Sequence, residues 1–145
     1  MSNPGATSEV PIAYLAGVLD ANGIFRIRET DGGTKLAAIF VHGVPIPILD
    51  LLSKYSGTKV SVVKRDYPRS PCLEHCDIPH QHIVSVSGRW SVTGAKATVM
   101  ISAILPHLIF QRDAAEEVLA VGLEAPRKKS SYAKMSAFGW PIPEA

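Results

Sequence analysis

The sequence LAGVLDANG at residues 15–23, followed directly by IFRIR at residues 24–28, joins a helical pattern to a strand pattern. Apolar residues recur at helical spacing from Ile12 to Leu19, and the helix is expected to end at Gly23, a residue able to adopt a positive φ. From residue 24 to residue 30, arginines alternate with apolar residues, which is typical of a half-buried strand. A helix rich in small residues therefore leads at once into a basic strand.

The rest of the chain predicts an ordered alternation of strands and helices. The hairpin turn at residues 31–33 leads to a strand at 35–41, then a helix at 48–55, a strand at 59–64, an interrupted strand at 83–86 and 90–92, and helices at 94–104 and 111–123. The order αββαββα(α), with hairpins between sequential strands, predicts an α+β domain with a mostly antiparallel sheet. We expect residues 1–9 to be disordered, residues 10–124 to form one domain, and residues 125–145 to be a loosely held basic tail.

Composition limits the class of protein. The chain has 145 residues, is 46% hydrophobic and carries a net charge of only +2, so any basic surface must be local. The N-terminus lacks a signal-peptide pattern, and the longest apolar run, residues 97–110, is broken by Pro106 and His107. These features predict an intracellular, cytoplasmic and nucleoid-associated protein with no membrane partner.

Residues 15–23 resemble the signature of the LAGLIDADG homing endonucleases, and the predicted order of elements is also that family's order. The runs WSVTG at 90–94, LPHL at 105–108 and AA at 114–115 are similar to the family's recurrent ending. The resemblance covers roughly residues 10–123 and implies the family's α+β fold, with a curved antiparallel sheet that binds double-stranded DNA. It also implies a gene derived from a phage or mobile element.

A single copy of the signature implies a symmetric homodimer joined by the signature helix. Small residues let two helix backbones approach closely, and the expected interface residues are Ala13, Ala16, Gly17 and Asp20. The alternative is a core helix whose small residues meet other parts of the same chain. A twofold dimer predicts a pseudo-palindromic DNA site.

Basic residues of the strands are the expected DNA contacts. In the family, alternate residues of the first strand face the major groove, and these positions are Arg26, Arg28 and Thr30 here. Further expected contacts to bases or phosphates are Lys35, Lys59, Lys64 and Arg65. The alternative is that Arg26 and Arg28 form the solvated face of an ordinary antiparallel sheet.

The residues expected to support cleavage depart from the family's pattern. Asn22 occupies the eighth signature position, where the family has its metal-binding acid, and Gln111 falls where the family places an assisting lysine. Asp20 is the remaining acid of the signature and could instead brace the helix end. These departures predict DNA binding with cleavage lost or weak. The alternatives are an active endonuclease dependent on Mg²⁺, an RNA-binding splicing helper and a purely structural dimerisation module.

A segment rich in cysteine and histidine separates the third and fourth strands. Cys72, Cys76, His80 and His82 could hold a structural Zn²⁺ with no open position, and His75 is an alternative ligand. A reducing compartment disfavours a disulfide between the two cysteines. The alternative is a solvated loop in which the cysteines happen to be close.

Overall fold

The computed structural model describes residues 10–67 and 83–143, and these residues form one four-stranded sheet with helices. The elements are α1 (Ile12–Asn22), β1 (Gly23–Glu29), β2 (Lys35–His42), α2 (Ile46–Ser56), β3 (Ser61–Tyr67), β4 (Ile83–Thr93), α3 (Ala95–Ile104), η1 (Leu105–His107), α4 (Arg112–Glu124) and α5 (Lys129–Ala137). The strand order is β1-β2-β4-β3, and every neighbouring pair is antiparallel. The predicted α+β class and the mostly antiparallel sheet are confirmed.

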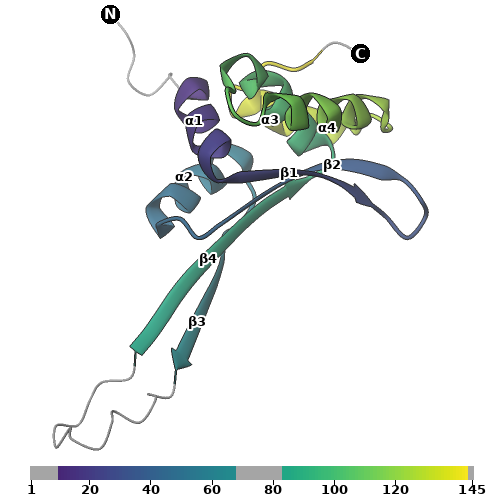
Figure 1. The fold of residues 1–145 in the computed structure, drawn as a ribbon. Helices are drawn as coiled ribbons and strands as arrows, with labels where there is room; N and C mark the ends of the chain where they lie inside the picture. Colours follow the sequence, from purple (N-terminus) through teal and green to yellow (C-terminus); the bar gives the residue numbers. More distant parts are fainter. Residues whose placement is uncertain (1–9, 68–82, 144–145) are drawn as a thin grey trace, which may run out of the picture.

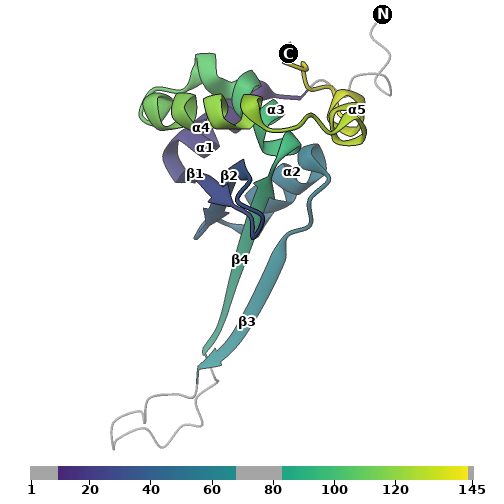
Figure 2. The same ribbon diagram turned by 90° about the vertical axis from the view of Figure 1, so that its right-hand side faces the viewer.

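The helices lie on one side of the sheet (Figure 1). Helices α1, α3 and α4 lie above β1 and β2, and α5 lies beside α3, as the perpendicular view shows (Figure 2). The β3–β4 hairpin extends away from the helical body. No helix in the described part of the chain covers the other side of the sheet, which we call the open face.

The core lies between the sheet and the helices because the strands direct apolar side chains towards the helices. Fully or almost fully buried residues come from both layers: Phe25, Ala37, Ile39, Val41, Trp90 and Val92 from the strands, and Leu15, Leu19, Leu49, Leu52, Met100, Ile101 and Ile104 from the helices. Burying one large apolar side chain contributes about 1.5–3 kcal/mol. The buried Trp90 Nε1 donates a hydrogen bond to Ser56 Oγ at 3.1 Å, which joins β4 to the end of α2.

Strand β4 is continuous, although the sequence predicts a break at Gly88. A Cβ built on Gly88 would lie 2.5 Å from Leu49 Cδ1 and 2.6 Å from Ile46 Cδ1. Helix α2 therefore packs directly on β4 at this glycine, and the missing side chain gives it room. The predicted interruption is wrong because Gly88 serves this close approach of helix and strand.

Gly23 also differs from its prediction. Its φ is −79° and its ψ is 153°, so it is extended backbone at the start of β1 and not a left-handed cap. A Cβ at this position would lie 2.6 Å from the carbonyl oxygen of Leu19. Glycine is required here because β1 leaves the last turn of α1 without a spacer, at a distance that a side chain would not allow.

The segment after Ala125 is not a loose tail. It forms α5, and Met135 and Trp140 are buried in the same core as the sheet residues. Trp140 Nε1 donates to the carbonyl oxygen of Tyr55 at 2.7 Å, and the Arg127 guanidinium lies 4.3 Å from the centre of the Tyr132 ring. In the described residues, no helix has the length and apolar character needed to cross a bilayer.

Candidate functional site

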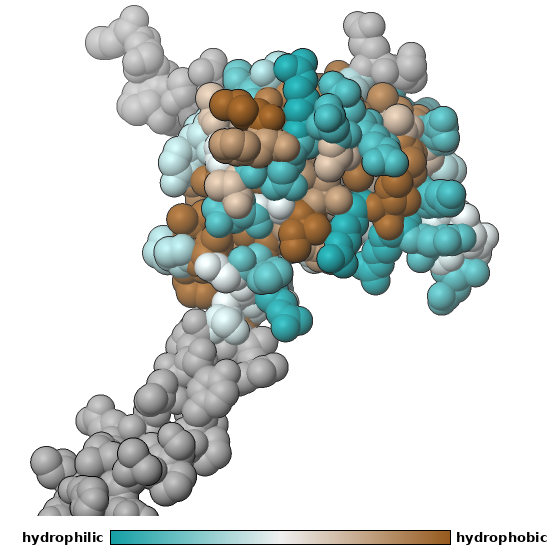
Figure 3. Space-filling model, in the orientation of Figure 1, coloured by the Kyte–Doolittle hydropathy of each residue, from teal (hydrophilic) through white to brown (hydrophobic). Residues whose placement is uncertain are grey.

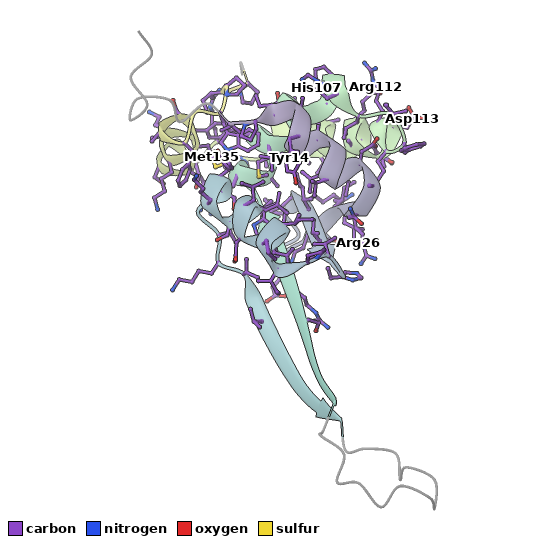
Figure 4. All side chains as sticks on the ribbon, turned by 90° about the vertical axis from the view of Figure 1, so that its left-hand side faces the viewer. Tyr14, Arg26, His107, Arg112, Asp113 and Met135 are labelled. Carbon is purple, nitrogen blue, oxygen red and sulfur yellow. The ribbon has the colours of Figure 1, made fainter. Side chains whose placement is uncertain are left out.

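The register of the sheet places the basic residues of β1 on the open face. Arg26 pairs with Ala38 and Arg28 pairs with Leu36, and residues directly opposite each other share a face. Phe25, between Ile24 and Arg26, is buried against the helices, so Arg26 lies on the opposite side. Figure 4 shows Arg26 low in the sheet layer, far from His107 and Arg112 in the helical layer. The predicted alternation of the first strand is confirmed.

The open face also carries Arg89 and His42, because β2 pairs with β4. His42 is opposite Arg89, and Arg89 is in turn opposite Ser61 of β3. These residues and Lys59 line a hollow of about 260 Å³ on this face. Lys59, predicted as the first residue of the third strand, precedes β3 but lines the same hollow as Arg89.

Sequence reasoning missed Arg89. The predicted interruption of the fourth strand around Gly88 leaves Arg89 outside the strand, although the alternation continues through residues 87–93. Ser87, Arg89 and Ser91 alternate with the buried Gly88, Trp90 and Val92. That alternation is the signal that identifies Arg89 as a residue of the open face.

Among the described side chains, no carboxylate forms an ion pair with these arginines. Among the described residues, the ion pair within 4.0 Å is Arg112–Glu116 on α4, and both of its side chains are more than half exposed. Arg26, Arg28 and Arg89 are exposed and outside that pair. The open face thus presents guanidinium groups that are free to meet an anionic partner.

Two other expected DNA contacts, Lys35 and Thr30, are placed differently from the arginines of the open face. Lys35 pairs with Glu29, on the helix side, and it lines a hollow with Val121 and Glu124 of α4. Thr30 lies at the hairpin turn, where its Oγ1 accepts a hydrogen bond from the amide N–H of Thr34 at 3.2 Å. Lys35 is therefore separated from the arginines.

The pairing of β3 separates Lys64 from Arg65. Lys64 is opposite Val86, and Arg65 is opposite Ser85. Successive strand positions belong to opposite faces, so Arg65 has the register of Ser61 on the open face and Lys64 has the other register. The backbone register thus groups Arg65, but not Lys64, with Ser61.

The carboxylate of Asp20 is bound by the start of the α4 segment. Its Oδ1 accepts the amide N–H groups of Phe110 and Gln111, both at 2.9 Å, and its Oδ2 accepts those of Ile109 and Phe110 at 3.0 and 3.1 Å. Burial raises the pKa of Asp20, but the bonds from Gln111, Phe110 and Ile109 outweigh it, so the pKa lies below its ordinary value of 3.8. Asp20 anchors the loop before α4, which is the bracing role at the helix end.

The side chain of Gln111 binds the backbone at the end of α1. Its Nε2 donates to the carbonyl oxygens of Leu19, Asp20 and Gly23 at 3.0, 3.0 and 2.7 Å. The last carbonyl groups of a helix have no partner within it, and the Gln111 amide binds those of Leu19 and Asp20 here, together with the β1 carbonyl of Gly23. The Leu19 carbonyl also accepts the amide N–H of Gly23. The position expected to assist cleavage therefore holds the end of α1 in place.

The residues at this end of α1 do not fit a magnesium site. A carboxylate has about four lone-pair positions, and both Asp20 oxygens are already engaged by three amide N–H groups, one of which, that of Phe110, is shared between them. Asn22 is exposed and neutral, and its Nδ2 donates to the Val18 carbonyl oxygen at 3.3 Å. Mg²⁺ prefers charged oxygen ligands, which Asn22 does not supply. The described residues contain no group of three or more His, Cys, Asp or Glu side chains placed to hold a metal.

The exposed side of α1 is small and uncharged. Ala13, Gly17 and Ala21 are exposed at intervals of four residues, and Tyr14 is 54% exposed beside them (Figure 4). Two of the expected interface residues lie elsewhere: Ala16 is fully buried in the core, and Asp20 faces the α4 segment. The sequence pattern could not separate the exposed side of α1 from its buried side, because small residues occur on both.

A pair of exposed apolar residues adjoins the end of α1. Ile109 is 78% exposed and Phe110 is 84% exposed, and the Asp20 carboxylate holds the amide groups of both. Hydrophobic patches interrupt the hydrophilic surface over the helical body in Figure 3. Large exposed apolar residues held in a fixed position are typical of an interaction surface.

The candidate zinc ligands Cys72, Cys76, His80 and His82, together with the alternative His75, lie outside the described residues. The zinc site therefore stays a prediction.

The fold is similar to that of a homing endonuclease. The crystal structure of the homing endonuclease I-CvuI in complex with its target, with calcium present, matches with a TM-score of 0.53 and 18% sequence identity, over 91% of this chain and 82% of that chain. A second I-CvuI structure, with an I-CreI target that is not cleaved in the presence of magnesium, matches with a TM-score of 0.49 and 18% identity, over 88% of this chain and 79% of that one. No protein-family model and no curated protein sequence matches the chain. The first comparison shows that the chain has the homing endonuclease fold.

Proposed function

We propose that a homodimer of this chain binds double-stranded DNA at a pseudo-palindromic site through the open face, with cleavage lost or weak. The observation that carries the proposal is the set of cations on that face: Arg26, Arg28, Arg89 and Lys59 lie on an uncovered antiparallel sheet. The fold is shared with I-CvuI, whose structure was determined in complex with its target.

The open face suits the major groove of DNA in shape and chemistry. That groove admits a β-ribbon, and arginine makes two parallel hydrogen bonds to the O6 and N7 atoms of guanine. Arg26 and Arg28 are two positions apart on β1 and project from the same side of it. Lys59 and Arg89 supply a second basic region beside the hollow on β4 and β3. A small net charge is compatible with this function because four cations lie together on the open face.

The homodimer forms through the exposed side of α1. A Cβ built on Gly17 meets no atom of the described residues within 4 Å, so none of them requires glycine there. Glycine within a helix costs about 0.5–1 kcal/mol relative to alanine, and a second helix packed closely against it explains the choice. The absence of charged groups on the exposed residues Ala13, Gly17 and Ala21 removes repulsion between two copies.

Loss of cleavage follows from the residues available as metal ligands at the end of α1. In a symmetric dimer, Asn22 occurs twice, and both copies of Asp20 are occupied by amide groups of the α4 segment. The site then lacks the negative charge that a divalent cation needs between two signature helices. The protein is a site-specific DNA binder, such as a repressor, that is derived from an endonuclease.

The test is to incubate the purified protein with a randomised duplex library, once with Ca²⁺ and once with Mg²⁺, and to sequence both the bound and the cut DNA. We expect a pseudo-palindromic sequence to be enriched in the bound fraction, without cut products in either ion. Cut products in Mg²⁺ would instead support the active endonuclease. Preference for structured RNA over duplex at one salt concentration would support the splicing helper. Absence of any nucleic-acid affinity would contradict the proposal.

A further inference from the structure

A cavity of about 400 Å³ lies where the end of β4, the start of α3 and the start of α5 meet. We call it the α3–α5 cavity. Two lysines line it, Lys96 and Lys128, and the hydroxyl-bearing residues of its lining are Thr58, Ser91, Thr93, Ser131 and Tyr132. The lining contains no aspartate or glutamate. This combination of cations and hydroxyl groups is the chemistry of an anion site.

The two lysines reach the cavity from different elements. Lys96 belongs to the first turn of α3, and a Cβ built on Gly57 would lie 3.6 Å from Lys96 Nζ, so its ammonium lies near the Gly57–Thr58 wall. Lys128 immediately precedes α5. Neither lysine belongs to the ion pair found among the described residues, and Glu124 lines a separate hollow with Lys35. Two cations that share a cavity without a carboxylate favour an anionic occupant.

We propose that the α3–α5 cavity binds a phosphate group. Lysine ammonium groups, the hydroxyls of serine, threonine and tyrosine, and free backbone amides are the groups that proteins use to bind phosphate oxygens. The lysines and hydroxyls carry the assignment. The starts of α3 and α5, neither of which has a side-chain cap, add amide donors at the same place.

The position of the cavity indicates two sources for the phosphate. Ser91 lies on the open face, opposite Phe40, and Thr93 lies opposite Ala38, so the cavity adjoins the edge of that face. A backbone phosphate of a bound duplex is one source, which rests on the proposed function. A free phosphorylated small molecule is the other, and it is independent of DNA binding.

The first experiment titrates inorganic phosphate into the full chain and follows backbone amide shifts by NMR, with chloride at equal ionic strength as the reference. We expect shifts concentrated at residues 94–96 and 128–132. They should disappear in the double variant Lys96→Met/Lys128→Met and persist in the matched variant Lys54→Met/Lys134→Met, whose lysines lie outside the cavity. Lys96→Gln/Lys128→Gln replaces the first variant if it fails to fold. Shifts that are scattered, or unchanged in the double variant, would overturn the proposal.

The second experiment measures duplex affinity as a function of salt concentration for the same variants. Each neutralised phosphate contributes about 0.9 to the slope of log K against log salt, so a duplex source predicts that the cavity variant lowers the slope by roughly one relative to the matched variant. Phosphate shifts with equal slopes assign the cavity to a free phosphorylated molecule. Phosphate shifts in a protein that binds no duplex support the cavity and contradict the proposed function. Equal slopes without localised shifts contradict the cavity itself.

Discussion

Asp20 and Gln111 each bind the backbone of the other. The amide N–H of Gln111 donates to Asp20 Oδ1 at 2.9 Å, and the Gln111 side-chain Nε2 donates to the Asp20 carbonyl oxygen at 3.0 Å. The two residues are 91 positions apart in the chain, so this reciprocal contact fixes the end of α1 against the start of α4. It positions the same helix whose exposed side is the proposed dimer interface.

The pH dependence of stability tests the Asp20 contact. The pKa of Asp20 is lowered in the folded protein, because its amide bonds outweigh burial, so its stabilising effect is complete above the ordinary pKa of 3.8 and is lost as the pH falls below it. We expect Asp20→Asn to lower the free energy of unfolding at neutral pH and to flatten its decline in acid, measured by urea denaturation between pH 7 and about pH 3. Asp113→Asn, an exposed acid in the first turn of α4, is the control. Identical pH profiles for Asp20→Asn and wild type would contradict this role.

Removing the side-chain amide of Gln111 should remove three hydrogen bonds from the end of α1 and the start of β1. We expect Gln111→Met, which keeps the length of the side chain, to destabilise the fold by about 1–3 kcal/mol, because the carbonyl groups of Asp20 and Gly23 lose this donor and that of Leu19 keeps only the amide N–H of Gly23. Gln111→Lys should retain much of the stability, since an ammonium can donate to the same carbonyls. Chemical denaturation measures both. A methionine variant as stable as wild type would show that water replaces the amide.

A large residue at position 17 should separate the dimer. Gly17→Leu places a side chain where the chain itself leaves space, so the monomer should stay folded while two α1 helices can no longer approach. We expect the dimer dissociation constant, measured by sedimentation, to rise by at least about tenfold, equivalent to roughly 1.4 kcal/mol. Ala120→Leu, at an exposed position of α4, is the matched control. Equal association of the two variants would rule out α1 as the interface.

Substitutions on the two faces of the β1–β2 hairpin should differ in their effect on DNA affinity. We expect Arg26→Ala and Arg28→Ala each to cost about 1–3 kcal/mol of affinity for the selected duplex, with relaxed preference at the base pairs they contact. Lys35→Ala should have a smaller effect because Lys35 lies on the helix side. Gel-shift titration at one fixed salt concentration measures all three. A larger effect for Lys35 than for the arginines would indicate that DNA binds on the helix side of the hairpin and would contradict binding through the open face.

Restoring an acid at position 22 tests the origin of the protein. Asn22 is exposed, so Asn22→Asp should fold normally and should return a charged oxygen ligand to each half of the dimer. We expect cleavage of the selected duplex in Mg²⁺ to appear or to increase, with no cleavage in Ca²⁺, and Asn22→Ala serves as the control. Strong cleavage by the wild-type protein would contradict the proposed loss of activity.

Local patterns were sufficient to predict most of the elements. The hairpin of β1 and β2, the alternation of Phe25 and Arg26, and the helical spacing of α1 and α3 all depend on neighbouring residues, and the structure confirms them. The errors arose where a residue serves a distant partner. Gly88 leaves room for Leu49, and Trp140 is bound by Tyr55.

The residues of the candidate site also differ in whether local sequence predicts them or tertiary contacts decide them. Periodicity alone placed Arg26 and Arg28 on one face of a strand, because side chains of a strand alternate whatever the strand pairs with. Arg89 joined them only through the pairing of β4 with β2 and β3. Asp20 and Gln111 acquired their roles only when α1 and α4 came together, since a hydrogen bond between residues so far apart in the chain depends on how the helices pack and not on the residues beside each of them.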